Sequence, residues 1–160
     1  MTTTAPIPPI TGTVTVALPL DKAFGVFTSS INSWWPHQFH IGAAEVAEVV
    51  LESGEGGRWY ERGVDGVECD WGRVLAWEPP NRLVFTWQIN GMWQFDPDPT
   101  HASEIEATFA ADGPDQTTVT VEHRYFERLE GGQAINDAIR GGGGWELLLD
   151  GFAKSVADQS

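Results

Sequence analysis

Three polar side chains stand among apolar and aromatic residues in segments whose alternation predicts β-strands. Strand alternation places Glu61, Arg73 and His123 on the same inward face as large apolar residues. A carboxyl group facing an imidazole across a cavity can act as a general acid or base, which is adequate chemistry for cyclisation or hydrolysis. Glu61 and His123 are therefore the candidate catalytic residues. A buried ion pair between Glu61 and Arg73 is the structural alternative, which we favour.

Two further histidines raise the question of a metal site. His37 and His40 are three residues apart in WWPHQFH, so with His123 or Glu61 they could form a metal shell. The sequence has no HExxH or HxxxH motif, and its single cysteine, Cys69, cannot form a ligand pair. We therefore expect no metal ion and no cofactor.

Nucleophile and nucleotide motifs are also missing from the sequence. It contains no GxSxG elbow, and the glycine run at residues 141–144 lacks the Lys and Ser/Thr of a phosphate-binding loop. This favours a binding protein over an enzyme.

Tryptophan is concentrated in the middle of the chain. Five of its eight tryptophans lie between Trp59 and Trp93. Large flat rings on a curved sheet often leave a void, and an apolar pocket with few polar groups is the usual small-molecule site. The alternative is that each ring simply fills the core. The predicted ligand-binding residues are Trp35, His37, Trp59, Glu61, Trp71, Arg73, Phe85, Trp87, His123, Trp145 and Leu149.

A run of strands must position these side chains. Val14, Val16 and Leu18 alternate in the first strand, and two short helices follow, one capped by Asp21 and one ending at Pro36. Further strands are predicted over residues 43–51, 58–62, 67–77, 82–89, 102–111 and 117–126. Because short turns join them, they form an antiparallel meander.

The C-terminal segment has helical periodicity. Apolar residues recur every three or four positions from Trp145 to Val156, so one face of this helix must be buried. The four glycines before it separate it from a helical stretch near residues 134–139 and leave Trp145 either as a gate or as a fixed core anchor. The predicted fold class is α+β, with a curved antiparallel β-sheet wrapped around a long C-terminal α-helix and two short helices after the first strand.

Composition excludes several partners. There are 23 acidic against 9 basic side chains, a formal net charge of −14, so nucleic acid and anionic membranes are not expected partners. No apolar run could span a bilayer, and the N-terminus has no signal-peptide pattern, so we expect a cytoplasmic protein. Residues 1–10 are predicted to be a disordered or extended leader and residues 11–160 a single domain.

An ordered series of short motifs resembles one protein family. The pieces VALPLDKAFGVFT, WWP, GGRWYE, WGRVLAWEPPNRLVFTW, SEIEATF, TTVTVEHRYFE and GGGGWELLLDGFA look like those of bacterial activator of heat-shock protein 90 ATPase-like (AHSA-type) proteins, within the SRPBCC or START-like superfamily. The resemblance runs from about Val14 onward. It implies the helix-grip fold, in which a sheet grips a long C-terminal helix and encloses a cavity, but it implies no single function.

Three functions follow from these observations, in this order. The first is binding of a small hydrophobic or aromatic molecule in the cavity, without turnover. The second is a polyketide cyclase/aromatase-like or hydrolase enzyme that uses Glu61 and His123. The third is a stand-alone chaperone accessory, for which the chain offers no second domain of the kind that established activators carry. A homodimer is left open.

Overall fold

The first strand of the chain pairs with the last strand rather than with its neighbour in sequence. The computed structural model of the protein describes residues 6–159, in which β1 (Ile10–Val16) lies antiparallel to β7 (Thr117–Arg124). The other strands follow in sequence order and complete one seven-stranded antiparallel sheet, β1-β7-β6-β5-β4-β3-β2. These are β2 (Val46–Leu51), β3 (Arg58–Gly63), β4 (Glu68–Glu78), β5 (Arg82–Trp87) and β6 (Ser103–Ala111). The predicted meander is confirmed.

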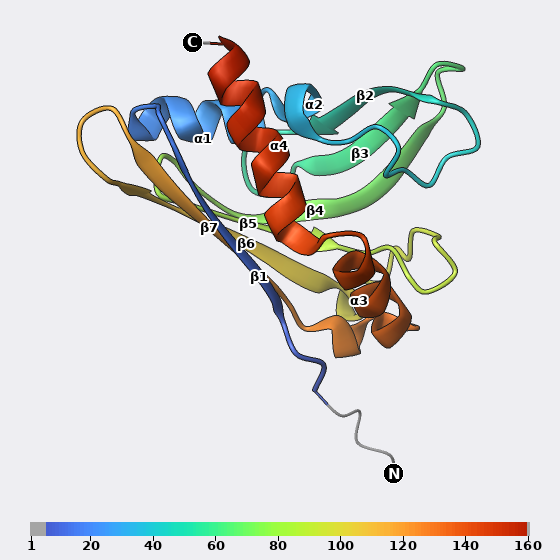
Figure 1. Ribbon diagram of the computed structural model, residues 1–160. Helices are drawn as coiled ribbons and strands as arrows, with labels where there is room; N and C mark the ends of the chain where they lie inside the picture. The colour runs from blue at the N-terminus through green and yellow to red at the C-terminus, as the bar shows by residue number, and fades with distance from the viewer. Residues whose placement is uncertain (1–5, 160) are drawn as a thin grey trace.

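The sheet curls around one long helix, α4 (Gly144–Gln159), which crosses its concave face (Figure 1). The helix lies directly on β1 at Gly12, where an added Cβ would come within 3.1 Å of Leu149 Cδ1. Helices α1 (Leu20–Thr28) and α2 (Ile31–Trp34) close one end of the sheet, and α3 (Gly132–Gly141) lies at the other end. The α+β helix-grip fold is confirmed.

Two local predictions at the N-terminal end were wrong. Helix α1 has Pro19 at its N-cap with no side-chain hydrogen bond, and Asp21 lies inside the first turn, where its charge complements the helix dipole. Strand β1 begins at Ile10, within the predicted leader. Residues 1–5 of that leader lie outside the described residues.

Strand β4 carries two extra residues that break its alternation. Trp71 is extra relative to β3, and Leu75 is extra relative to β5. Each such bulge shifts the alternation of inward and outward side chains by one position, so the second restores the phase that the first disturbs. Trp71 and Trp77 therefore both face inward, as predicted, while the residues between the bulges follow the opposite phase.

This phase shift overturns the prediction for Arg73. The side chain faces outward, where it pairs with Asp70 at 3.2 Å, donates to the carbonyl of Gly72 and lies 5.7 Å from the ring of Phe95. It makes no contact with Glu61, so the proposed buried ion pair does not exist. Val74 takes the inward position instead and is buried.

Gly72 allows the first bulge to lie close to β5. A Cβ there would lie 2.0 Å from the carbonyl oxygen of Thr86, which is far inside any real contact. We expect Gly72→Ala to lower the free energy of unfolding by about 3 kcal/mol, because backbone must move. Gly25→Ala in α1 is the matched control. No atom lies within 4 Å of its added Cβ, so it should stabilise by about 0.5–1 kcal/mol. Urea unfolding measures both, and equal midpoints for the two variants would contradict the close approach.

Candidate functional site

Tryptophan rings line a cavity beside the N-terminus of α4. Its volume is about 300 Å³, at the lower end of the range for small-molecule sites. The lining comes from the loop after α2, from β4 and β5 and the loop after β5, and from α3 and α4. It consists of Trp35, Gln38, Phe39, His40, Ile41, Trp71, Trp87, Ile89, Trp93, Ala138, Ile139, Gly142, Gly144, Trp145 and Leu148.

Four of the predicted binding residues lie on this wall: Trp35, Trp71, Trp87 and Trp145. Trp59 and Phe85 are completely buried behind it, with their ring centroids 4.7 Å apart, and Leu149 is buried under the sheet. His37 is exposed and hydrogen-bonds Asn32 Oδ1 at 2.8 Å. The predicted set therefore divides into wall residues, residues that support the wall, and His37 and Arg73, which lie outside it.

A chain of hydrogen bonds through His123 fixes two of the wall tryptophans. The indole N–H of Trp145 donates to His123 Nδ1 at 3.2 Å, so the histidine proton must sit on Nε2. That N–H donates to Ser103 Oγ at 2.9 Å, and the serine hydroxyl donates to the carbonyl oxygen of Trp87 at 2.9 Å. The chain joins α4, β7, β6 and β5. Trp145 is held as a core anchor, the second of the two predicted alternatives.

The same contacts leave His123 without a free nitrogen. It is completely buried, and burial lowers its pKa from 6.5 to about 3. A neutral imidazole that already accepts one hydrogen bond and donates another has no atom left for a substrate. The structure does not bring Glu61 and His123 together, and His123 acts as a positioning residue for the two tryptophans.

Glu61 is buried in a cradle of N–H donors. Its carboxylate accepts from the backbone N–H of Ile41 at 2.6 Å, from that of Gly42 at 3.2 Å and from the indole N–H of Trp71 at 3.0 Å. A side chain at position 42 would push the carboxylate aside, since a Cβ there would lie 2.9 Å from Glu61 Oε2. The cradle ties the loop after α2 to the wall of the cavity.

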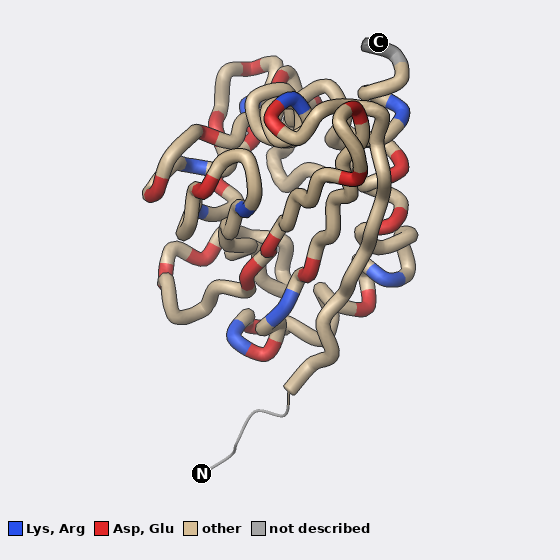
Figure 2. Tube along the Cα trace, turned by 90° about the vertical axis from the view of Figure 1, so that its left-hand side faces the viewer, with Lys and Arg blue, Asp and Glu red and all other residues tan. Residues whose placement is uncertain are grey.

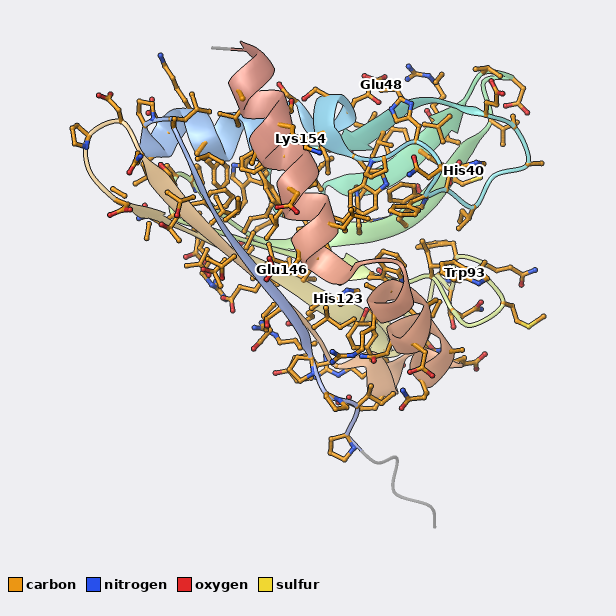
Figure 3. The ribbon with its side chains drawn as sticks, viewed as in Figure 1. His40, Glu48, Trp93, His123, Glu146 and Lys154 are labelled. Carbon is orange, nitrogen blue, oxygen red and sulfur yellow. The ribbon has the colours of Figure 1, made fainter. Side chains whose placement is uncertain are left out.

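His40 is the wall residue that sequence reasoning assigned only to a metal shell. It lies in the loop after α2, across the mouth from Trp93 on the loop after β5 (Figure 3). The predicted binding set also lacked these lining residues: Gln38, Phe39, Ile41, Ile89, Trp93, Ala138, Ile139, Gly142, Gly144 and Leu148. Most of them lie in loops or at helix ends, where no periodicity reports which way a side chain points. The only available signal was the cluster of aromatic and histidine residues in WWPHQFH.

The histidine shell that the sequence left as a possibility, and that we did not expect, does not form among the described residues. His37, His40 and His123 are separated, and the one group of metal-type ligands found in the described residues is Asp96, His101 and Glu130. Two of its members are already engaged with each other, because the Asp96 carboxylate accepts from His101 at 2.7 Å; it also accepts from the backbone N–H of Asp98 at 3.0 Å. The backbone and His101 hydrogen bonds lower the pKa of Asp96, and the bond to Asp96 raises the pKa of His101. Acidic positions elsewhere are spread along the chain (Figure 2).

The buried neutral state of His123 predicts a pH dependence of stability. Between pH 6.5 and about 3 the unfolded chain binds a proton at this residue that the folded protein excludes. The free energy of unfolding should therefore fall as the pH falls through this window, by at most about 1.4 kcal/mol per pH unit from this group.

His123→Gln tests this dependence. A glutamine can accept from Trp145 and donate to Ser103 but gains no proton, so urea unfolding from pH 4 to 7 should show a shallower slope than in the wild type. His37→Gln, at an exposed histidine, should leave the slope unchanged. Parallel curves for the wild type and His123→Gln would show that His123 does not titrate differently on unfolding.

Comparison with solved structures shows two relatives of nearly full length. An anthrahydroquino-γ-pyrone synthase, Txn09, is 39% identical, with 94% of this chain and 97% of that chain covered and a TM-score of 0.67. The self-sacrificing resistance protein CalC from Micromonospora echinospora is 31% identical over 96% of each chain, with a TM-score of 0.69. CalU16 from the same organism, at 22% identity, 94% of this chain, 77% of that chain and a TM-score of 0.57, shares the fold.

Three further comparisons concern curated proteins, membrane-spanning helices and protein families. No curated protein sequence gave a significant match. No helix within residues 6–159 has the length and apolarity needed to cross a lipid bilayer. The family described as activator of Hsp90 ATPase homolog 1-like protein matches residues 17–157, almost the whole chain. Together with the helix-grip sheet and its gripped helix, this match shows that the chain belongs to the AHSA1 family of the SRPBCC superfamily.

Proposed function

We propose that the protein binds a planar, polycyclic aromatic molecule in the tryptophan-lined cavity. The observation that carries this proposal is the state of the indole N–H groups on the wall. Those of Trp35, Trp71, Trp87 and Trp145 all donate to acceptors inside the protein. Four of the five wall tryptophans therefore offer only ring surfaces, and Trp93, Gln38 and His40 carry the remaining polar side-chain groups of the lining. Such a wall favours flat apolar molecules with few polar groups.

One of the two relatives above 30% identity supports this class of ligand. One is named as a synthase of an anthrahydroquino-γ-pyrone, a fused-ring aromatic compound, and it matches the chain end to end at 39% identity. The other is named as a resistance protein and carries no such implication. The family name alone would favour a chaperone partner.

Helix α3 offers a matched pair of variants that tests cavity binding. Ala138 lines the cavity, whereas Ala134, one turn earlier, is exposed away from it. Ala138→Trp should obstruct the cavity at little cost in stability. We expect alizarin, a three-ring hydroxyanthraquinone, to quench the tryptophan fluorescence of the wild type. Ala138→Trp should weaken its binding at least about tenfold, or about 1.4 kcal/mol.

Ala134→Trp introduces the same ring on the same helix and should bind alizarin within a factor of about two of the wild type. Native mass spectrometry of each complex gives the stoichiometry, which we expect to be one. Equal affinities of the two variants would place the dye outside the cavity. Absence of binding to the wild type would refute the proposal for this ligand class.

A second candidate function is ring closure of the bound molecule. The whole-length similarity to a synthase favours it. In the simplest such step, a phenol oxygen adds to a carbon–carbon double bond conjugated with a ketone. The new C–O bond closes the ring, the double bond becomes single, and the phenol proton ends on the carbon next to the ketone. The product is an isomer of the substrate, so no oxidant, reductant or cofactor is consumed.

2′-Hydroxychalcone, which closes to flavanone by this step, is a suitable probe. Ring closure in buffer gives a racemic product, whereas closure in a chiral cavity should give an excess of one enantiomer, measured by chiral chromatography. The excess should persist in Ala134→Trp and disappear in Ala138→Trp. A racemic product at the buffer rate, with alizarin binding intact, would leave the binding proposal standing and rule out this reaction.

A further inference from the structure

One ring on the cavity wall also faces a buried carboxylate. The His40 side chain lines the cavity and is 26% exposed, while its Nδ1 atom is buried and lies 3.6 Å from Glu61 Oε2. Nδ1 has no hydrogen-bond partner among the described residues. Because that nitrogen is turned toward Glu61, the other ring nitrogen, Nε2, is the one left for a molecule in the cavity.

The carboxylate of Glu61, next to His40, has no arginine or lysine partner among the described residues. Glu61 is 1% exposed, and its neighbours are neutral N–H donors. The nearby arginines of β3 and β4 are all committed elsewhere: Arg58 and Arg73 pair with Asp70, and Arg62 pairs with Glu48. In the described part of the chain, His40 is the one basic group within ion-pair distance of Glu61. A buried carboxylate without a cation is costly, so a positive charge arriving on the His40 ring would be stabilised by Glu61.

We infer that His40 is the proton acceptor for a hydroxyl group of the bound aromatic molecule, with Glu61 as the residue that positions and charges the ring. This inference rests on the proposed binding function. The phenolic O–H of the ligand gives its proton to Nε2 and becomes a phenolate. The imidazolium ion then directs its Nδ1–H at Glu61. The present distance of 3.6 Å must shorten for a hydrogen bond, as such contacts commonly do when a ligand fills the site.

A titratable thiol lies close to the pair. Cys69 on β4 lies beside Gly42, with its Sγ 3.3 Å from where a Cβ at that glycine would stand. Burial and the charge of Glu61 raise the pKa of this thiol, so it stays protonated and does not compete for the ligand proton. Gln38 and Trp35, also on the wall, do not titrate. The ligand class is thereby narrowed to aromatic molecules with an acidic phenol, such as one conjugated with a ring ketone.

Alizarin reports both binding and proton transfer. Quenching of tryptophan fluorescence measures binding, and the visible absorption band shifts to longer wavelength when the dye becomes a phenolate. At a pH where free alizarin is mostly neutral, we expect the ratio of phenolate to phenol to be at least about tenfold higher on the wild type than in buffer. His40→Gln keeps a polar side chain of similar reach but cannot take the proton. It should bind alizarin and leave it in the neutral form.

Variants around Glu61 test its role as the positioning residue. Glu61→Gln removes the charge, and Gly42→Ala displaces the carboxylate by placing a Cβ 2.9 Å from Oε2. Both should lower the phenolate ratio toward that of His40→Gln while quenching persists. If Glu61→Gln fails to fold, Gly42→Ala still tests the role of the Glu61 carboxylate. His37→Gln is the control and should behave as the wild type.

The two proposals fail in different ways. Quenching with the same phenolate ratio in His40→Gln as in the wild type would overturn the role of His40 and leave the binding function intact. Absence of quenching in the wild type would overturn the binding function and this inference with it.

Discussion

The structure depends on finding acceptors for the indole N–H groups that tryptophan brings into the interior, and among the described residues only that of Trp59 is buried without one. The space between a strongly curved sheet and a helix is wide, and tryptophan fills it with large apolar area. Each ring also carries a donor that is costly to bury unpaired. Three unrelated acceptors meet this need: a carboxylate for Trp71, a backbone carbonyl for Trp87 and a neutral imidazole for Trp145. The polar residues that resemble a catalytic set from sequence are largely these acceptors.

The sequence predicts the fold well because its signals are local and periodic. Alternation in β6 and β7 and the three- and four-residue spacing in α4 predicted which faces are buried, and the motif series predicted the order of elements. Alternation failed in β4, where the extra residues Trp71 and Leu75 reverse the phase over a short stretch and turn Arg73 outward. Gly72 is the one residue in that stretch whose type indicates a bulge. Its role becomes clear only from its close approach to the backbone of Thr86 in the structure.

The site was harder to predict than the fold. Wall residues on strands, such as Trp71 and Trp87, can be predicted because strand alternation gives the face on which each side chain lies. His40 and Trp93 lie in loops, whose conformation depends on contacts with distant parts of the chain. The loop that carries His40 is held by hydrogen bonds from Ile41 and Gly42 to Glu61, twenty positions along the chain. Membership of the AHSA1 family adds the cavity and the gripped helix, but the chemistry of the cavity still comes from these individual side chains.

The paired bulges of β4 also constrain how this sequence can change over evolutionary time. Loss of one extra residue would turn every side chain beyond it to the opposite face, exposing tryptophans and burying charges. Loss of both would keep the ends of the strand in phase but remove the register that brings Trp71 to Glu61. Deletions in this strand are therefore tolerated poorly one at a time, and the length of β4 should drift far less than the lengths of the loops around it.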